Sequence, residues 1–166
     1  DLYGHREKKQ SIQELINLPQ FSKNGKKLFF SHSINNVNQI AILNLNNNTN
    51  SKVEYISSSS SSYFPAPFQN GMKLVYQRNS KKREIIIYNL VDKKEKIIGF
   101  GMAPSLSKDE RYIAYTSKVN NNWDIFIYDR FNSTTIKVTN NKSNDFSPVF
   151  DRNNNLIYTS DRLENG

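Results

Sequence analysis

The sequence has no cysteine and only two histidines, five prolines and six glycines among its 166 residues. Without cysteine the chain has no disulfide, no thiolate metal site and no cysteine nucleophile. The histidines, His5 and His32, lie far apart in the sequence, and neither belongs to a His-Glu-x-x-His pattern. The lack of cysteine suits a reducing cytoplasm and an envelope protein equally, so it does not choose a compartment.

The sequence also lacks the short motifs of common enzymes and any long apolar run. There is no Gly-x-Ser-x-Gly motif and no glycine-rich phosphate loop with its lysine. No apolar stretch approaches the ~20 residues that a membrane-spanning helix requires. We therefore predict a protein that is not an enzyme, uses no cofactor or metal, and has no membrane span. The chain begins at Asp1 without a visible signal peptide, which we interpret as a processed product or a fragment.

A short sequence motif that recurs four times is the most informative feature of the sequence. Each copy begins with a proline or an aromatic residue. A polar turn follows, and then a short run of apolar and aromatic residues. Equivalent residues in successive copies are 46, 39 and 43 positions apart. A repeat of about 40–45 residues made of strands is typical of a β-propeller blade. The equivalent residues are Leu28, Leu74, Ile113 and Leu156.

The third copy shows the four expected strands of one blade most clearly. Apolar and polar residues alternate in it, with β-branched and aromatic residues enriched, and runs of asparagine mark the turns. We therefore predict an all-β fold of β-propeller blades, each a four-stranded antiparallel meander. Strands are expected at 103–106, 112–117, 123–128 and 134–139 in the third copy, at 39–45 and 52–56 in the first, and at 84–90 and 94–98 in the second.

The chain is predicted to form a single β-propeller domain, or part of a larger propeller, with three whole blades and two half blades. Two arrangements stay open at this point. The half blades could pair with each other and close a small four-bladed ring, or the chain could belong to a larger ring, which we favour. The expected boundaries are a half blade at 1–18, blades at about 19–62, 63–102 and 103–145, and a half blade at 146–166.

The repeat resembles the TolB-type propeller repeat, a WD40-like unit that also occurs in the propellers of the tricorn and prolyl oligopeptidase families. The resemblance covers nearly the whole chain. In two copies, Glu110 and Asn154 replace the family's turn glycine, and these departures are expected to loosen single turns. The residues that carry the resemblance are Pro19 to Gly25, Pro65 to Gly71, Pro104 to Asp109, Ile113 to Ser117, Asp124 to Phe126, Ser147 to Phe150 and Leu156 to Arg162.

The resemblance implies a non-catalytic scaffold that mediates protein–protein interaction. By analogy with a family member that contacts an outer-membrane lipoprotein, it implies a partner in the cell envelope or periplasm, with the cytoplasm as the other compartment. Two alternatives belong to other classes. One is a substrate-gating propeller of a serine peptidase whose catalytic domain is absent. The other is a basic surface that binds nucleic acid or an anionic polymer, since the net charge is +8.

The positions of the basic clusters favour a protein partner over nucleic acid. In a meander, the loops after the second and fourth strands lie on one face of the ring, and the loops after the first and third strands lie on the other. The cluster 81–83 belongs to the first face and Lys93-Lys94 to the second, so they do not form one patch.

Irregular connections gather on one of these faces, and we predict that it binds the partner. The serine run 57–62 joins the first two blades there, beside the loops at 81–83 and 120–121. Long, variable loops on a rigid framework are where binding residues concentrate. The predicted partner-binding residues are Ser57, Ser60, Ser62, Lys81, Lys82, Arg83, Asn120 and Asn121.

Overall fold

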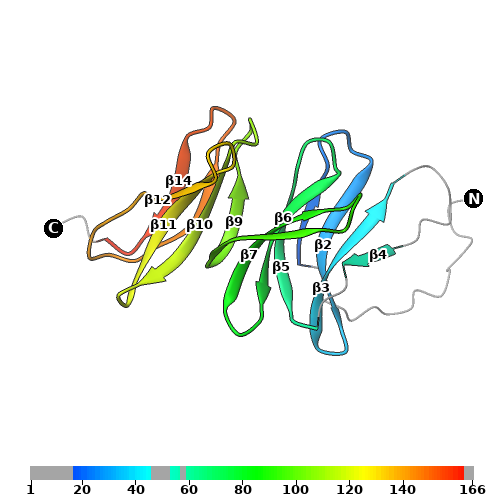
Figure 1. Ribbon diagram of the computed structural model, residues 1–166, viewed down its shortest axis with the longest axis horizontal. Helices are drawn as coiled ribbons and strands as arrows, with labels where there is room; N and C mark the ends of the chain where they lie inside the picture. The colour runs from blue at the N-terminus through cyan, green and yellow to red at the C-terminus, as the bar shows by residue number, and fades with distance from the viewer. Residues whose placement is uncertain (1–16, 46–52, 57–58, 163–166) are drawn as a thin grey trace, which may run out of the picture.

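The computed structural model describes residues 17–45, 53–56 and 59–162, and every regular element in these ranges is a β-strand (Figure 1). The strands form four antiparallel sheets in chain order, three with four strands and one with two. Each sheet is a meander of consecutive strands. The strands are β1 (Asn17–Phe21), β2 (Lys27–Ile34), β3 (Val37–Asn44) and β4 (Val53–Ile56); β5 (Ser62–Pro67), β6 (Lys73–Asn79), β7 (Arg83–Asn89) and β8 (Glu95–Phe100); β9 (Met102–Leu106), β10 (Tyr112–Val119), β11 (Asn122–Asp129) and β12 (Thr134–Lys137); and β13 (Asp145–Phe150) and β14 (Leu156–Ser160).

The all-β propeller fold predicted from the repeat is confirmed. The eight strands expected in the first three copies match β3, β4 and β7–β12 to within two residues at each end. The half blade expected at 1–18 lies outside the described residues, except for 17 and 18. The blade boundaries therefore stay a prediction.

Asparagine occupies both positions of two tight hairpin turns, where the backbone is left-handed. The turns between the second and third strands of the first and third sheets are Asn35-Asn36 and Asn120-Asn121, with φ of +50°, +63°, +49° and +65°. A two-residue hairpin turn that suits the twist of the strands needs positive φ at both positions, which asparagine tolerates better than most residues.

The two residues that replace the turn glycine keep the left-handed conformation of that glycine. Glu110 has φ of +61° and Asn154 of +64°, close to the +66° of Gly25. Instead of loosening their turns, both side chains bond to the preceding sheet. The Glu110 carboxylate accepts the Gln69 amide, and Asn154 Oδ1 accepts the Lys108 amide at 2.8 Å.

A proline occupies the same place in the first strand of every sheet. The strand pairing shifts in register at each of these points, as at a β-bulge. Proline cannot donate to the ladder, so it is compatible with such an interruption. In all four cases the residue before the proline has φ between +52° and +55°. These pairs are Leu18-Pro19, Phe64-Pro65, Ala103-Pro104 and Ser147-Pro148.

The apolar core lies between neighbouring sheets. One cluster joins the first and second sheets around Phe29, Leu74 and Tyr76. The other joins the second and third sheets around Val75 and Ile113. Successive residues of β6 therefore face opposite neighbours, as the two-residue period of a strand requires.

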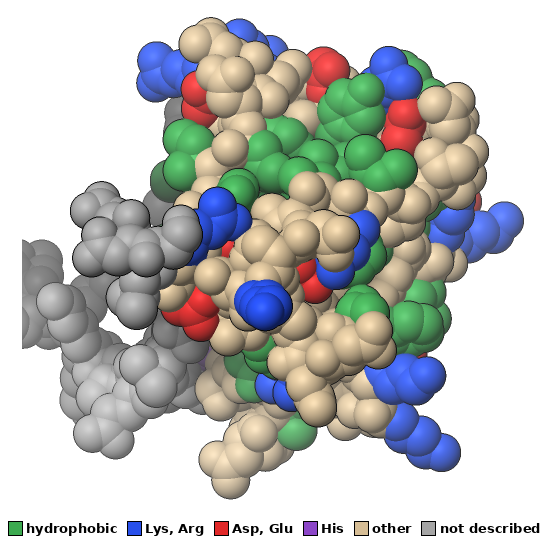
Figure 2. All heavy atoms as spheres, turned by 90° about the vertical axis from the view of Figure 1, so that its left-hand side faces the viewer, with side chains coloured by type: hydrophobic (Ala, Val, Ile, Leu, Met, Phe, Trp, Pro, Cys, Tyr) green, Lys and Arg blue, Asp and Glu red, His purple; other side chains and the backbone are tan. Residues whose placement is uncertain are grey.

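The end of the molecule formed by the last strands carries exposed apolar side chains, and Figure 2 shows hydrophobic groups gathered on it. Ile157 of β14 is 60% exposed, whereas the equivalent Val75 and Ala114 are fully buried. The reason is local: among the described residues, β14 has no third strand beside it and no following sheet over it.

An ion pair in the third sheet joins Arg111, just before β10, to Asp129 at the end of β11. The Arg111 guanidinium donates to Asp129 Oδ2 at 2.8 and 3.2 Å. This bond, with the backbone amides of Phe131 and Asn132, lowers the pKa of Asp129 to about 2. A carboxyl group has a pKa of about 3.9 in an unfolded chain. Asp129 therefore stabilises the fold fully above about pH 4, and this contribution is lost as the pH falls through about 2.

We expect Asp129→Asn to flatten the acid side of the stability profile between about pH 4 and pH 2. Urea midpoints measured through this range would show it, with the exposed Asp92→Asn as a control for the loss of one carboxylate. An unchanged slope in the Asp129 variant would contradict the assignment.

Candidate functional site

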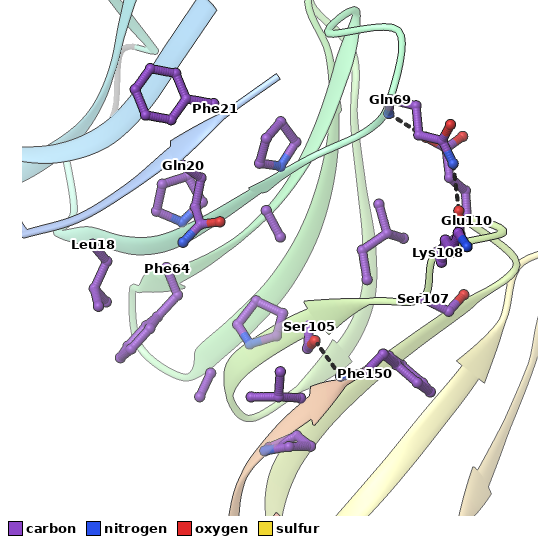
Figure 3. A pocket seen from close by; sticks show the side chains of 18 of the residues that line it. Leu18, Gln20, Phe21, Phe64, Gln69, Ser105, Ser107, Lys108, Glu110 and Phe150 are labelled. Carbon is purple, nitrogen blue, oxygen red and sulfur yellow. Dashed lines mark hydrogen bonds between the residues drawn. The ribbon is translucent and has the colours of Figure 1, made fainter. Parts of the chain in front are cut away.

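The first strands of the four sheets line a hollow of about 600 Å³ (Figure 3). Its apolar lining includes Leu18, Phe21, Phe64 and Val149, and Phe21 is 64% exposed. These residues come from β1, β5 and β13, so the repeat itself places them around one space. A concave apolar surface of this size is a usual place for binding.

The polar rim of the hollow is used to connect the turns of successive sheets. Gln69 is the centre of this connection, as the dashed lines of Figure 3 show. Its side-chain oxygen accepts Lys23 Nζ at 2.6 Å, and its side-chain nitrogen donates to the Lys108 carbonyl. Because its backbone amide also donates to Glu110, Gln69 joins three sheets. The hydrogen bonds of the rim therefore connect the turns of three successive sheets.

The serine connection predicted as part of a partner surface lies against two neighbouring hairpins. Ser61 accepts the Asn38 amide on its hydroxyl at 3.2 Å and the Asn79 amide on its carbonyl at 2.7 Å. Ser57 lies outside the described residues, and Ser60 is half-buried. Ser62 opens β5 and is buried, with its hydroxyl on the Ser60 carbonyl. Ser62 is therefore inaccessible to a partner, because the start of its strand is packed against the first sheet.

Cations and aromatic rings from two sheets meet beside this connection. Arg83 begins β7 and Lys118 is the penultimate residue of β10, and each lies 5.7 Å from the ring centroid of Trp123. Lys82 Nζ lies 5.0 Å from the ring centroid of Phe100, which is 50% exposed. We call these five residues, Lys82, Arg83, Phe100, Lys118 and Trp123, the loop face.

The loop face contains two of the predicted residues and borders three others. Lys81 precedes Lys82 in an exposed turn, and Asn120-Asn121 forms the exposed turn between Lys118 and Trp123. Sequence reasoning missed Phe100, Lys118 and Trp123: it assigned Trp123 to a strand and left the other two just outside the expected strands. The one available signal was that Trp123 is the single tryptophan of the chain.

The positive charge of the loop face is not neutralised by ion pairs within the described chain. Its cations are absent from the ion pairs found there, and the adjacent Glu84 is bound to Arg78 at 2.9 Å. Asp161 accepts the backbone and side-chain amides of Asn144 at 2.6 and 2.8 Å, and Asn144 accepts the Trp123 amide at 3.1 Å. Lys82, Arg83 and Lys118 therefore have no carboxylate partner among the described residues.

No three histidine or acidic side chains come together among the residues that the structure describes. Within the same ranges, no helix has the length and apolar character needed to cross a membrane.

Comparison with solved structures identifies the fold. A protein assigned as TolB from Agrobacterium tumefaciens superposes with a TM-score of 0.75 at 16% identity, over 87% of this chain and 53% of that one. TolB from Acinetobacter baumannii gives 0.63 at 20% identity, over 90% and 36%. The tricorn protease gives 0.65 at 21% identity, over 87% and 15%. No family model and no curated protein matches the sequence.

These likenesses show that the chain has a TolB-like β-propeller fold, as its repeat predicted. The chain spans about half of the first of these structures and less of the others. Both TolB proteins and a protease carry the fold, so the fold alone does not separate binding from catalysis.

Proposed function

We propose that this chain is a non-catalytic β-propeller scaffold that binds an acidic segment of a protein partner through the loop face. The observation that carries the proposal is the convergence of Arg83 and Lys118, from different sheets, on Trp123. Their charges have no carboxylate partner among the described residues.

The residue types of the loop face, and the strands that hold them, favour a protein partner. Tryptophan and arginine dominate the residues that carry binding energy in protein interfaces. Here they stand at the ends of β7, β10 and β11, so the sheets hold them in place. Uncompensated cations also accelerate encounter with an acidic partner and reject a basic one.

The same contacts argue against nucleic acid as the ligand. Single-stranded nucleic acids bind by stacking bases on the faces of aromatic rings. At the loop face, cations already lie over the rings of Phe100 and Trp123. The rings are therefore poorly placed to stack with bases. The cations are better placed to meet carboxylates at the surface.

The resemblance to the TolB-type repeat supports an envelope partner. By that analogy, we infer that the scaffold works in the cell envelope or periplasm and that its partner is an envelope protein. The inference concerns the compartment and does not alter the chemistry expected of the partner.

We expect Arg83→Gln with Lys118→Gln to weaken partner binding about tenfold or more, since charge-assisted hydrogen bonds contribute about 1.5–3 kcal/mol each. The partner would be captured from an envelope extract with the wild-type chain and identified by mass spectrometry. Its affinity for each purified variant would then be measured by calorimetry.

The matched control is Lys26→Gln with Lys93→Gln, which removes the same charge from exposed turns on the opposite face. It should bind like the wild type. The proposal fails if the two double variants bind the partner equally well. It also fails if the wild type retains only nucleic acid that high salt removes.

A further inference from the structure

The second basic cluster of the sequence, Lys93 to Lys96, is not part of the loop face. The structure places it beside a groove of about 380 Å³ between the second and third sheets. The groove lies among the turns that follow the first and third strands, on the face opposite the loop face. Its volume lies within the range of small-molecule sites, about 300–1,000 Å³.

Four cations line the groove, and they come from separate elements. Lys73 begins β6, Lys94 and Lys96 belong to the turn before β8 and to β8 itself, and Arg130 follows β11. Because two sheets supply these charges, the fold itself brings them together. A run of lysines along one exposed strand would not do so.

The two carboxylates of the lining have partners within the chain. Asp92 Oδ1 accepts the Lys94 backbone amide at 3.1 Å, which fixes the turn. Glu95 accepts Arg78 at 2.7 Å and the Tyr76 hydroxyl at 2.9 Å. The groove therefore keeps an excess of positive charge.

Hydroxyl groups stand beside one of the cations at the wall of the groove. Lys96 Nζ donates to the Tyr128 hydroxyl at 2.8 Å, and that hydroxyl lies 3.3 Å from Ser133 Oγ. Tyr128 itself is buried, so its hydroxyl is held in place. Lys96 Nζ also donates to Ser133 Oγ at 3.5 Å, which leaves one further ammonium hydrogen to donate.

The pKa of Tyr128 reports the positive field in this groove. Burial alone would raise the pKa of Tyr128, but its hydrogen bonds with Lys96 and Ser133 and the charges of Lys96 and Arg130 lower it below its usual value. A phenol that is buried and still acidified indicates that this environment favours negative charge.

We propose that this groove is a binding site for a phosphate group, free or carried by a small molecule. The lysines act as point charges that can surround a tetrahedral oxyanion. A planar carboxylate would instead favour the forked donor of arginine. The guanidinium of Arg130 is already bound to the Glu110 carbonyl and lies 4.4 Å from the ring centroid of Phe68.

The test is calorimetric titration of the protein with inorganic phosphate and with pyrophosphate at constant ionic strength. Saturable binding is expected for both, and tighter binding of pyrophosphate would identify a ligand larger than the free ion. Lys94→Gln with Lys96→Gln should weaken binding about tenfold or more. Lys94→Gln alone keeps the Lys96 bond to Tyr128, so it tests the charge without disturbing the wall of the groove.

The control is Lys26→Gln with Lys142→Gln, which removes two exposed charges outside both surfaces. It should bind phosphate within about twofold of the wild type. The proposal is overturned if the wild type shows no saturable binding, or if the control loses as much affinity as the groove variant. The loop-face variant, Arg83→Gln with Lys118→Gln, should keep phosphate binding, which makes this site separable from the proposed function.

Discussion

Replacing Gly101 with alanine is expected to lower the free energy of unfolding by about 3 kcal/mol or more. A Cβ atom on this residue would lie 2.1 Å from the backbone oxygen of Thr116 and 2.9 Å from Cδ2 of Tyr115. Thr116 pairs with Met102 in the ladder of the third sheet, so its carbonyl cannot move without breaking strand pairing. Gly101 is therefore required at the point where the second and third sheets connect.

Urea denaturation of Gly101→Ala beside Gly25→Ala would separate steric clash from backbone strain. Nothing lies within 4 Å of a Cβ on Gly25, but its φ is +66°. Alanine there should cost only about 1 kcal/mol. Equal costs for the two variants would show that the contact at Gly101 does not limit stability.

Phe29→Ala is expected to cost about 3–5 kcal/mol, because it opens a cavity between the first two sheets. Phe29 is fully buried in the cluster that joins these sheets. The matched control is Phe21→Ala, a phenylalanine of the same sheet that is 64% exposed at the hollow. It should change stability by no more than about 0.5 kcal/mol.

Thermal and urea denaturation of both variants would give the difference. Similar losses for Phe29→Ala and Phe21→Ala would mean that packing between the sheets is not the main stabilising contribution. A loss confined to Phe29→Ala would confirm that the repeat depends on its neighbours.

The strands could be predicted from the sequence because local and long-range preferences agree in them. In β10 and β11, β-branched and aromatic residues alternate, and asparagines mark the turn between them. Four copies in the same register reinforce each signal. The left-handed residues before proline could not be foreseen in this way. Leu18 and Phe64 have no intrinsic preference for positive φ, and the residue before a proline is normally extended.

The loop face was predictable only in outline. The alternation of loops in a meander put 81–83 and 120–121 on the same face. The sequence does not show that Arg83 and Lys118 converge on one ring, because that depends on the rotation between adjacent sheets. Ser62 was misjudged for a related reason: a serine run is usually solvated, but this residue begins a packed strand.

The division of the core between neighbouring sheets has a consequence for how the chain gains and loses structure. Each apolar cluster joins one pair of sheets, and only the second sheet contributes to both. Stability then resembles that of a linear array, a sum of unit energies and nearest-neighbour couplings. Within the described chain, the second sheet is the one on which both apolar clusters depend. If the chain unfolds from either end, the second sheet still keeps its apolar contact with one neighbouring sheet. A destabilising change within the second sheet weakens its contacts with both the first and the third sheet.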